Sequence, residues 1–258
     1  MTPSDALPLL RSARLDALPG IAAGFSTRAG GVSTGAYSHR DGHGGLNLGR
    51  STADDAASVD ENRRRFAAAF GLTPGDTAIA GQVHGTVVQT AGAPGLYGGT
   101  DGLVTATPGL LLCITAADCA AVLLADPDAR VVGACHAGWR GAVGGIVEET
   151  LRQMAALGAD PARVVAAIGP CISQDAFEVG PEVAAHFGPA RVRPGTGDLV
   201  HADLAGEIAD RLAAAGIAPD RIDASGACTV LDADGRFFSH RASGGTTGRM
   251  MGAIALVA

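Results

Sequence analysis

The chain has 258 residues and a formal net charge of −7, and all 19 of its basic residues are arginine. The acidic balance argues against a non-specific nucleic-acid binder, which normally carries a basic patch to neutralise phosphates. The absence of lysine excludes a Schiff-base lysine and the lysine-bearing phosphate loop, so any bound anion must be held by arginine, backbone amides or a metal.

No apolar run approaches the roughly 18 to 20 residues that a membrane helix needs, so we do not expect a membrane among the partners of this protein. The N-terminal stretch has an early acid and no cationic start before an apolar core, which does not resemble a secretory signal. The five cysteines are odd in number and include no C-x-x-C pair, so we expect reduced thiols rather than a disulfide framework or a local four-cysteine zinc site. These features predict a cytoplasmic protein.

The first half of the chain alternates between glycine-rich and regular segments. A short apolar lead opens residues 24–37, which otherwise predict a loop rich in Gly, Ser and Thr that continues as an exposed excursion. Residues 52–71 have acids early, arginines late and a terminal glycine, which predicts a helix. Residues 77–90 predict two strands separated by a turn at His84 and Gly85.

The second half repeats a plan in which a strand leads to a glycine-rich turn. Residues 109–126 hold two apolar runs around a polar break at Asp118 and Cys119, and the next strand is expected to end near His136. Helices are predicted for 142–157 and 201–216, with a strand between them at 163–173. Residues 226–258 predict a strand, an Asp-Gly turn, a second strand, a Gly/Thr loop and a closing strand. This order indicates a single-domain, mixed-sheet α/β sandwich.

Three side chains with metal-binding chemistry share a setting. His84, Cys119 and His136 each lie where an apolar run meets a turn of small residues. Imidazole and thiolate ligands suit zinc, and three protein ligands with an open fourth position are typical of catalytic zinc. Two other interpretations stay open at this point: packing at strand ends, and a Cys119 nucleophile with a histidine base. Cys135, beside His136, is expected to point to the opposite face and join the core.

Four arginines lie beside glycine-rich turns and could hold a phosphate or carboxylate. They are Arg28, Arg140, Arg241 and Arg249. A rigid guanidinium next to closely approaching backbone amides is typical of an anion site, whereas salt bridges and loop-carbonyl contacts are the alternative. Trp139 is expected to be a packing anchor rather than a stacking platform for a base.

Several motifs occur together in a fixed order: QVHG, TAADCAAVLLAD, CHAGWRG, IGPCIS, FEVG and FFSHR…GGTTGRM. With them the chain resembles, from about Gly24 to Ile254, the YfiH-like family of laccase-domain or polyphenol oxidase proteins, now described as multifunctional purine nucleoside phosphorylases. The resemblance implies a four-layer α-β-β-α sandwich. It also implies phosphorolysis of adenosine, inosine or guanosine and S-methyl-5′-thioadenosine to the free base and a ribose 1-phosphate, together with deamination of adenosine to inosine.

The same resemblance implies that His84, Cys119 and His136 are the catalytic metal ligands, for zinc or, as an alternative, copper. We expect Arg28 and a glycine-loop amide to bind phosphate and Asn47 to orient the nucleoside, with Arg140 and Arg249 as further substrate-binding residues. Asp118 and Glu178 are the candidate proton carriers. The partners are then a purine nucleoside and phosphate, while the oligomeric state stays open.

Two departures from the family pattern concern the substrate. About six residues are inserted at Ser38–Gly45, and His240 stands where the family more often has tyrosine. Other functions remain as alternatives: a copper-dependent oxidoreductase, a Cys/His hydrolase of amides, and a zinc-stabilised binding protein without activity. Multicopper oxidases bind their ions largely through H-x-H pairs, and this chain has seven histidines and no such pair. A multicopper laccase is therefore not expected.

Overall fold

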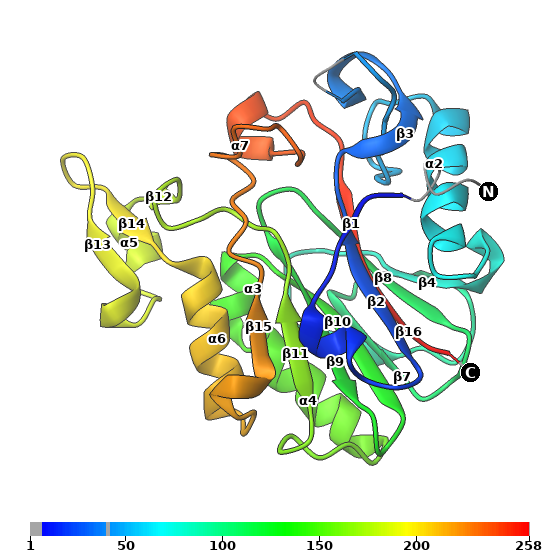
Figure 1. The fold of residues 1–258 in the computed structure, drawn as a ribbon. Coiled ribbons are helices and arrows are strands. Elements are labelled where there is room, and N and C mark those ends of the chain that lie inside the picture. The colour runs from blue at the N-terminus through cyan, green and yellow to red at the C-terminus, as the bar shows by residue number, and fades with distance from the viewer. Residues whose placement is uncertain (1–6, 40–41, 258) are drawn as a thin grey trace.

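The computed structural model describes residues 7–39 and 42–257 and contains two six-stranded mixed sheets (Figure 1). The first sheet has the order β1 (Leu9–Leu10), β2 (Ile21–Ser26), β16 (Met250–Leu256), β8 (Leu111–Ala116), β4 (Thr77–Ala80), β6 (Gly95–Tyr97). The second has the order β15 (Ile222–Ala224), β11 (Val165–Ile168), β9 (Ala120–Asp126), β10 (Val131–Ala137), β7 (Gly102–Thr105), β5 (Val88–Thr90). Both sheets combine parallel and antiparallel pairs.

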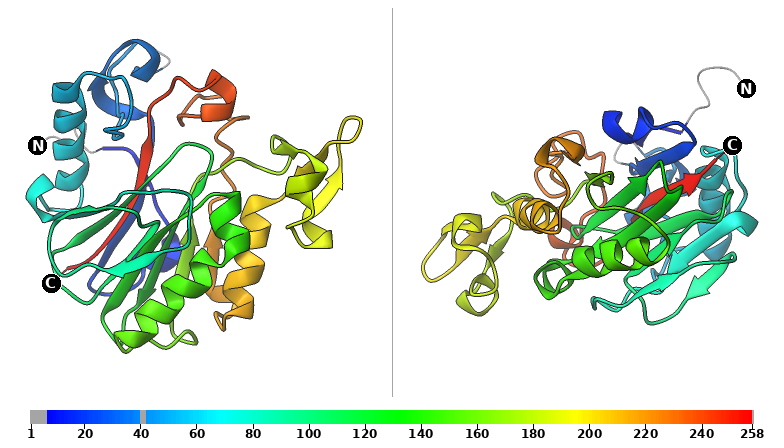
Figure 2. Two further views of the ribbon diagram at one scale, coloured as in Figure 1. Left: turned by 180° about the vertical axis from the view of Figure 1, so that it is seen from behind. Right: turned by 90° about the horizontal axis from the view of Figure 1, so that it is seen from below.

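Helices cover the outer faces of both sheets, so the fold is the predicted four-layer α-β-β-α sandwich (Figures 1 and 2). Helix α2 (Ala56–Ala68) packs on the first sheet through Phe66 and its neighbours. Helices α4 (Ile146–Ala156) and α6 (Leu204–Ala214) pack on the second sheet. Helix α2 begins at an Asp55 cap whose carboxylate accepts the Ser58 amide, as expected for a helix start.

The apolar run of β9 shows why two sheets pack face to face. Val122 and Leu124 point into the core beneath α4 and α6, whereas Leu123 and Ala125 point into the core between the sheets. Since side chains alternate along a strand, a strand buried on both faces reads as a continuous apolar run. Strand β10 is likewise buried along its whole length. The glycine-rich turn that follows it lies at one rim of the sandwich.

The remaining elements are short and lie around this body. They are α1 (Ala13–Asp16), β3 (Ala29–Ser33), η2 (Gly35–Tyr37), η3 (Pro74–Asp76), α3 (Trp139–Gly144), β12 (Glu178–Val179), α5 (Pro181–Ala184), η4 (Pro189–Arg191), β13 (Val192–Pro194), β14 (Val200–Ala202), η5 (Pro219–Arg221) and α7 (His240–Ser243). Strands β12, β14 and β13 form a small third sheet that projects from the body (Figure 1).

The structure corrects three expectations about local structure. The helix expected from residue 142 begins at Trp139 and breaks at Gly145, whose φ of +97° lies in the left-handed region. The segment 24–37 holds β2 and β3 as well as the expected loop. The inserted segment at 38–45 is only partly described, because residues 40–41 lie outside the described ranges.

The third correction concerns the tail, where the Asp-Gly turn forms without its two flanking strands. Gly235 donates its amide to the Asp232 carbonyl, as a turn requires. Phe237 and Phe238 are consecutive and both buried, packed with Met250 in a small separate cluster. A strand with one solvated face would send consecutive side chains to opposite sides, so this packing disfavours the predicted strand.

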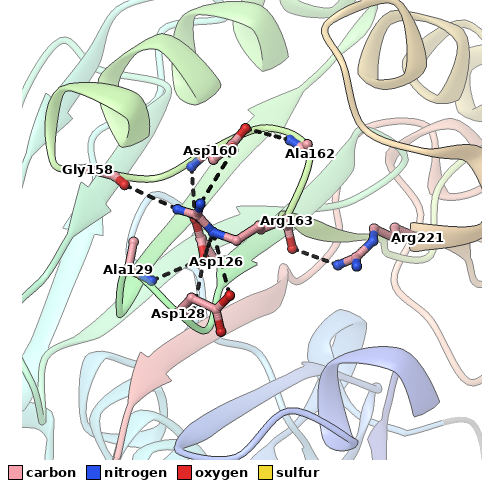
Figure 3. A network of polar contacts seen from close by, with 8 residues as sticks. All are labelled: Asp126, Asp128, Ala129, Gly158, Asp160, Ala162, Arg163 and Arg221. Carbon is pink, nitrogen blue, oxygen red and sulfur yellow. Dashed lines mark hydrogen bonds and ion pairs between the residues drawn. The ribbon is translucent and has the colours of Figure 1, made fainter.

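An ion pair between a buried carboxylate and a partly exposed arginine joins elements at the rim of the second sheet that lies away from His136 (Figure 3). Asp126, the last residue of β9, is fully buried and accepts hydrogen bonds from Arg163 and from the amides of Ala129 and Asp160. Arg163 thereby joins the turn before β11 to the end of β9. Among the described ranges, no helix has the length and apolar character needed to cross a membrane.

Candidate active site

The structure brings together the three residues with metal-binding chemistry. His84 lies between β4 and β5, Cys119 lies between β8 and β9, and His136 lies near the end of β10. Their ligand atoms all lie within 4.8 Å of one another. The two imidazole rings meet edge to face, with centroids 4.8 Å apart. Within residues 7–39 and 42–257 this is the one group of His, Cys, Asp or Glu side chains that could hold a metal ion.

Unusual backbone conformations shape the two loops that carry His84 and Cys119. Gln82, His84 and Asp118 have positive φ angles of 27°, 61° and 86°. Non-glycine residues adopt such conformations at a cost and concentrate at functional sites. The Gln82 side chain joins the loop of His84 to strand β8, because its Nε2 donates to the Thr115 carbonyl at 2.7 Å and its Oε1 accepts from the Thr115 amide at 2.8 Å.

Asp101 positions both histidines, and the sequence analysis did not identify it. Its fully buried carboxylate accepts hydrogen bonds from the amides of Val83, His84 and Gly85 and lies 2.9 Å from Nδ1 of His136. A carboxylate that binds Nδ1–H leaves Nε2 of His136 as the free ligand atom, a common arrangement around metal-binding histidines. The sequence signal that could have identified Asp101 is its position, as an acid directly before the apolar strand β7.

Local electrostatics favour a thiolate at Cys119. Burial raises the pKa of the thiol, but hydrogen bonds and charge from His136 and His84 outweigh burial and lower that pKa to about 6. Burial lowers the pKa of His136, whereas Asp101 and the Cys119 thiolate raise it to about 9. The thiolate and two imidazoles form a borderline-soft donor set that suits zinc or copper. The residues present therefore fit a metal ion.

The contacts around Gly138 explain why a glycine stands two residues after His136. A Cβ placed on Gly138 would lie 2.8 Å from Sγ of Cys119 and 3.4 Å from the His84 ring. Gly138 caps the start of α3, so the chain turns from β10 into a helix directly over the ligand cluster. Cys135 is fully buried in the core beneath the helices, as predicted.

The cluster lies in a half-open cavity of about 420 Å³. Trp139, Ile172, Phe177 and Leu204 form its apolar lining. The other residues that line it are Ser51, Gln82, His84, Thr115, Ala116, Ala117, Asp118, Cys119, His136, His240, Arg241 and Arg249. A cavity with an apolar wall and a few polar groups is typical of a small-molecule site.

Two of the candidate arginines line this cavity. Nη1 of Arg249 donates to the carbonyls of Thr247 and Gly248, which leaves further N–H groups for a ligand. Arg241 is exposed, and its backbone amide donates to Asp118 at 2.7 Å. Asp118 also accepts from the Thr229 hydroxyl at 2.6 Å, so its carboxylate holds the C-terminal segment at the cavity.

The other candidate residues lie outside the cavity lining. Arg28 donates to the carbonyls of Ser38 and Ala36 and stacks on Phe238, while Arg140 stacks on Trp139.

Asn47 is fully buried, and its Oδ1 accepts the amide of Arg249 at 2.8 Å. The structure therefore gives Asn47 a supporting contact to Arg249. Glu178 accepts the Thr196 amide in the small third sheet and does not line the cavity.

The chain matches the family model described as multi-copper polyphenol oxidoreductase laccase over residues 22–257. It is 48% identical over 257 residues to a Deinococcus radiodurans protein named purine nucleoside phosphorylase, covering 97% of this chain and 93% of that one. It is 36% identical over 244 residues to Escherichia coli purine nucleoside phosphorylase YfiH, covering 92% and 95%. YlmD from Geobacillus stearothermophilus has a similar structure, with a TM-score of 0.88 at 30% identity, covering 98% of this chain and 100% of that one. The chain therefore belongs to the YfiH-like, laccase-domain family.

Proposed function

We propose that this chain is a metal-dependent purine nucleoside phosphorylase. Its substrates are adenosine, inosine or guanosine and S-methyl-5′-thioadenosine, and it also deaminates adenosine to inosine. One observation carries the proposal: the His84, Cys119 and His136 cluster shares a cavity with the anion-binding side chains of Arg241 and Arg249. The names of the relatives from D. radiodurans and E. coli support the same substrate class.

Each part of the cavity meets a separate requirement of phosphorolysis. Phosphate is an anion that must be held against the sugar, which Arg241 and Arg249 can do through charged N–H donors. The purine is flat and apolar, and the wall formed by Trp139 and Phe177 offers it aromatic surface. Phosphate oxygen then bonds to the anomeric carbon as the carbon–nitrogen bond breaks, and the base leaves with its electron pair.

His84, Cys119 and His136 would hold the metal, and Asp101 keeps the His136 ring oriented. A bound zinc would supply Lewis acidity and lower the pKa of a coordinated water, which is the chemistry that deamination needs. Without metal, the lowered pKa of Cys119 keeps its sulfur ready as a thiolate ligand.

The proposal is tested by incubating adenosine with the zinc-loaded protein in the presence and absence of phosphate. We expect adenine and ribose 1-phosphate only with phosphate. We expect inosine in both samples, with part of it converted to hypoxanthine where phosphate is present, as separated by chromatography. The Cys119→Ser variant should lose both reactions. Formation of neither product by the wild-type protein would contradict the proposal and favour the amide hydrolase.

Copper-dependent phenol oxidation is the second candidate, because two histidines and one cysteine also suit a single copper ion. The described residues hold one such cluster, and the whole chain has seven histidines, too few for a multicopper centre. Metal analysis of protein purified without added metal distinguishes the nucleoside enzyme from the copper oxidase. Zinc at about one ion per chain supports the nucleoside enzyme, whereas copper together with phosphate-independent phenol oxidation supports the oxidase.

A further inference from the structure

A second cavity, of about 580 Å³, lies between α2 and the outer face of the first sheet. It shares no lining residue with the cavity that holds His84 and Cys119. It is lined by Arg50, Asp60, Arg63, Phe66, Pro74, Gly75, Thr77, Ile79, Pro94, Gly95, Leu96, Cys113 and Met251. Its volume falls within the roughly 300 to 1,000 Å³ that is usual for small-molecule sites.

The floor of this second cavity is an apolar strip across three neighbouring strands. Leu96 of β6 pairs in register with Ile79 of β4, and Ile79 pairs with Cys113 of β8. On the next strand, Cys113 faces Ala253, a small residue. Leu96 is 74% exposed, Ile79 is partly buried and Cys113 is fully buried, so a ligand would contact this strip at its Leu96 and Ile79 end.

One charged group in the second cavity, Arg63, makes no ion pair of its own among the described residues, although the carboxylate of Asp60 is near it. Arg63, on α2, donates Nε to the Leu48 carbonyl at 2.9 Å, and its Nη1 and Nη2 have no hydrogen-bond partner among the described residues. Burial and the nearby Arg50 lower the pKa of Arg63. The neighbouring carboxylate of Asp60 is paired with Arg50. Two guanidinium groups and one carboxylate leave a net charge of +1 at this cavity.

We propose that the second cavity binds a small organic carboxylate with an acyl or aryl body. The carboxylate accepts the Nη1 and Nη2 donors of Arg63, and the apolar body lies on Leu96 and Ile79. A planar guanidinium binds a carboxylate through two parallel hydrogen bonds. The single excess positive charge matches a carboxylate better than a phosphate dianion. This site is separate from the nucleoside reaction proposed above.

Decanoate is a suitable probe, with decanol and decylamine as controls of the same chain length. Isothermal titration of the full-length protein should show decanoate binding at one site, with at least about tenfold weaker binding of both controls. The Arg63→Met variant, which keeps an unbranched apolar stem but removes the guanidinium group, should weaken decanoate binding by about tenfold or more. Arg64→Met is the matched control, since Arg64 is on the same helix, is exposed and pairs with Glu61.

Leu96→Glu provides an independent test, because the exposed Leu96 can be replaced without disturbing the core. The added carboxylate should repel decanoate and abolish measurable binding, while circular dichroism stays unchanged. Absence of decanoate binding to the wild-type protein would overturn the proposal. Equal binding of decanoate and decanol, or equal losses in Arg63→Met and Arg64→Met, would overturn it as well.

Discussion

Nδ1 of His136 lies 2.9 Å from Oδ1 of Asp101, and both side chains are buried, with residue exposures of 3% and 0%. The same carboxylate accepts the backbone amides of Val83, His84 and Gly85. One buried acid therefore fixes the ring of one candidate ligand and the loop of another. Such supporting partners orient metal-binding side chains and thereby raise metal affinity.

Replacing Asp101 by Asn should weaken zinc binding about 10- to 100-fold. The amide nitrogen of Asn would face N–H donors, so the loop at His84 and the ring of His136 would both lose an acceptor. Competition with a chromophoric zinc chelator measures the affinity. Asp126→Asn is the matched control, since Asp126 is equally buried but lies in a separate network. Equal zinc affinities for the two variants would contradict a positioning role for Asp101.

The close contact above Cys119 predicts an effect of a single methyl group. Gly138→Ala should reduce zinc affinity by about tenfold or more, because the new Cβ would have to displace Sγ from its position 2.8 Å away. The backbone at Gly138 has φ −71°, which alanine adopts without strain. Gly92→Ala is the control, since a Cβ there meets no atom within 4 Å. If both variants bind zinc like the wild type, the loops at the site tolerate the methyl group.

The ion pair between the buried Asp126 and the partly exposed Arg163 should contribute to stability in a pH-dependent way. Burial raises the pKa of Asp126, but Arg163 and the amides of Asp160 and Ala129 outweigh it and lower the pKa. The stabilisation is therefore complete above the unfolded pKa of about 4 and is lost as the pH falls through the folded pKa. Asp126→Asn should lower the free energy of unfolding by about 1 to 3 kcal/mol at pH 7.

Urea denaturation at pH 7 and at lower pH measures this effect. The difference in unfolding free energy between the wild type and Asp126→Asn should shrink as the pH falls below about 4. A difference that stays constant with pH would show that the ionised carboxylate is not the source of the stabilisation.

Kinetics can distinguish Arg249 from Arg28 as the residue that binds phosphate. Because Arg249 lines the cavity, Arg249→Met should raise the KM for phosphate roughly 10- to 100-fold while leaving metal content unchanged. Arg28 donates to the carbonyls of Ser38 and Ala36 outside that lining, so Arg28→Met should leave the KM for phosphate near that of the wild type. The reverse result would restore Arg28 as the phosphate ligand.

The sequence was sufficient to predict most regular elements of the fold. The apolar run of β9 indicated a strand, and the acid-to-arginine order of α2 indicated a helix that ends near Gly71. The two strands expected beside the Asp-Gly turn were predicted wrongly, because the consecutive burial of Phe237 and Phe238 depends on Met250, a contact that local periodicity cannot show. The closing strand of the tail was predicted correctly. The break at Gly145 was missed because the apolar spacing of α4 starts directly after it.

For the site, the sequence by itself determined the chemical types of the ligands and the turns that carry them. Tertiary structure alone decided that His84, Cys119 and His136 converge, because two of them come from different connections between the two sheets and the third from the end of strand β10. It also decided which polar groups face the cavity: Arg249 lines it, whereas Asn47 is buried behind it and holds the Arg249 backbone. The sequence specifies the type of each side chain, but the direction in which a side chain points and the residues it contacts depend on how distant strands pack.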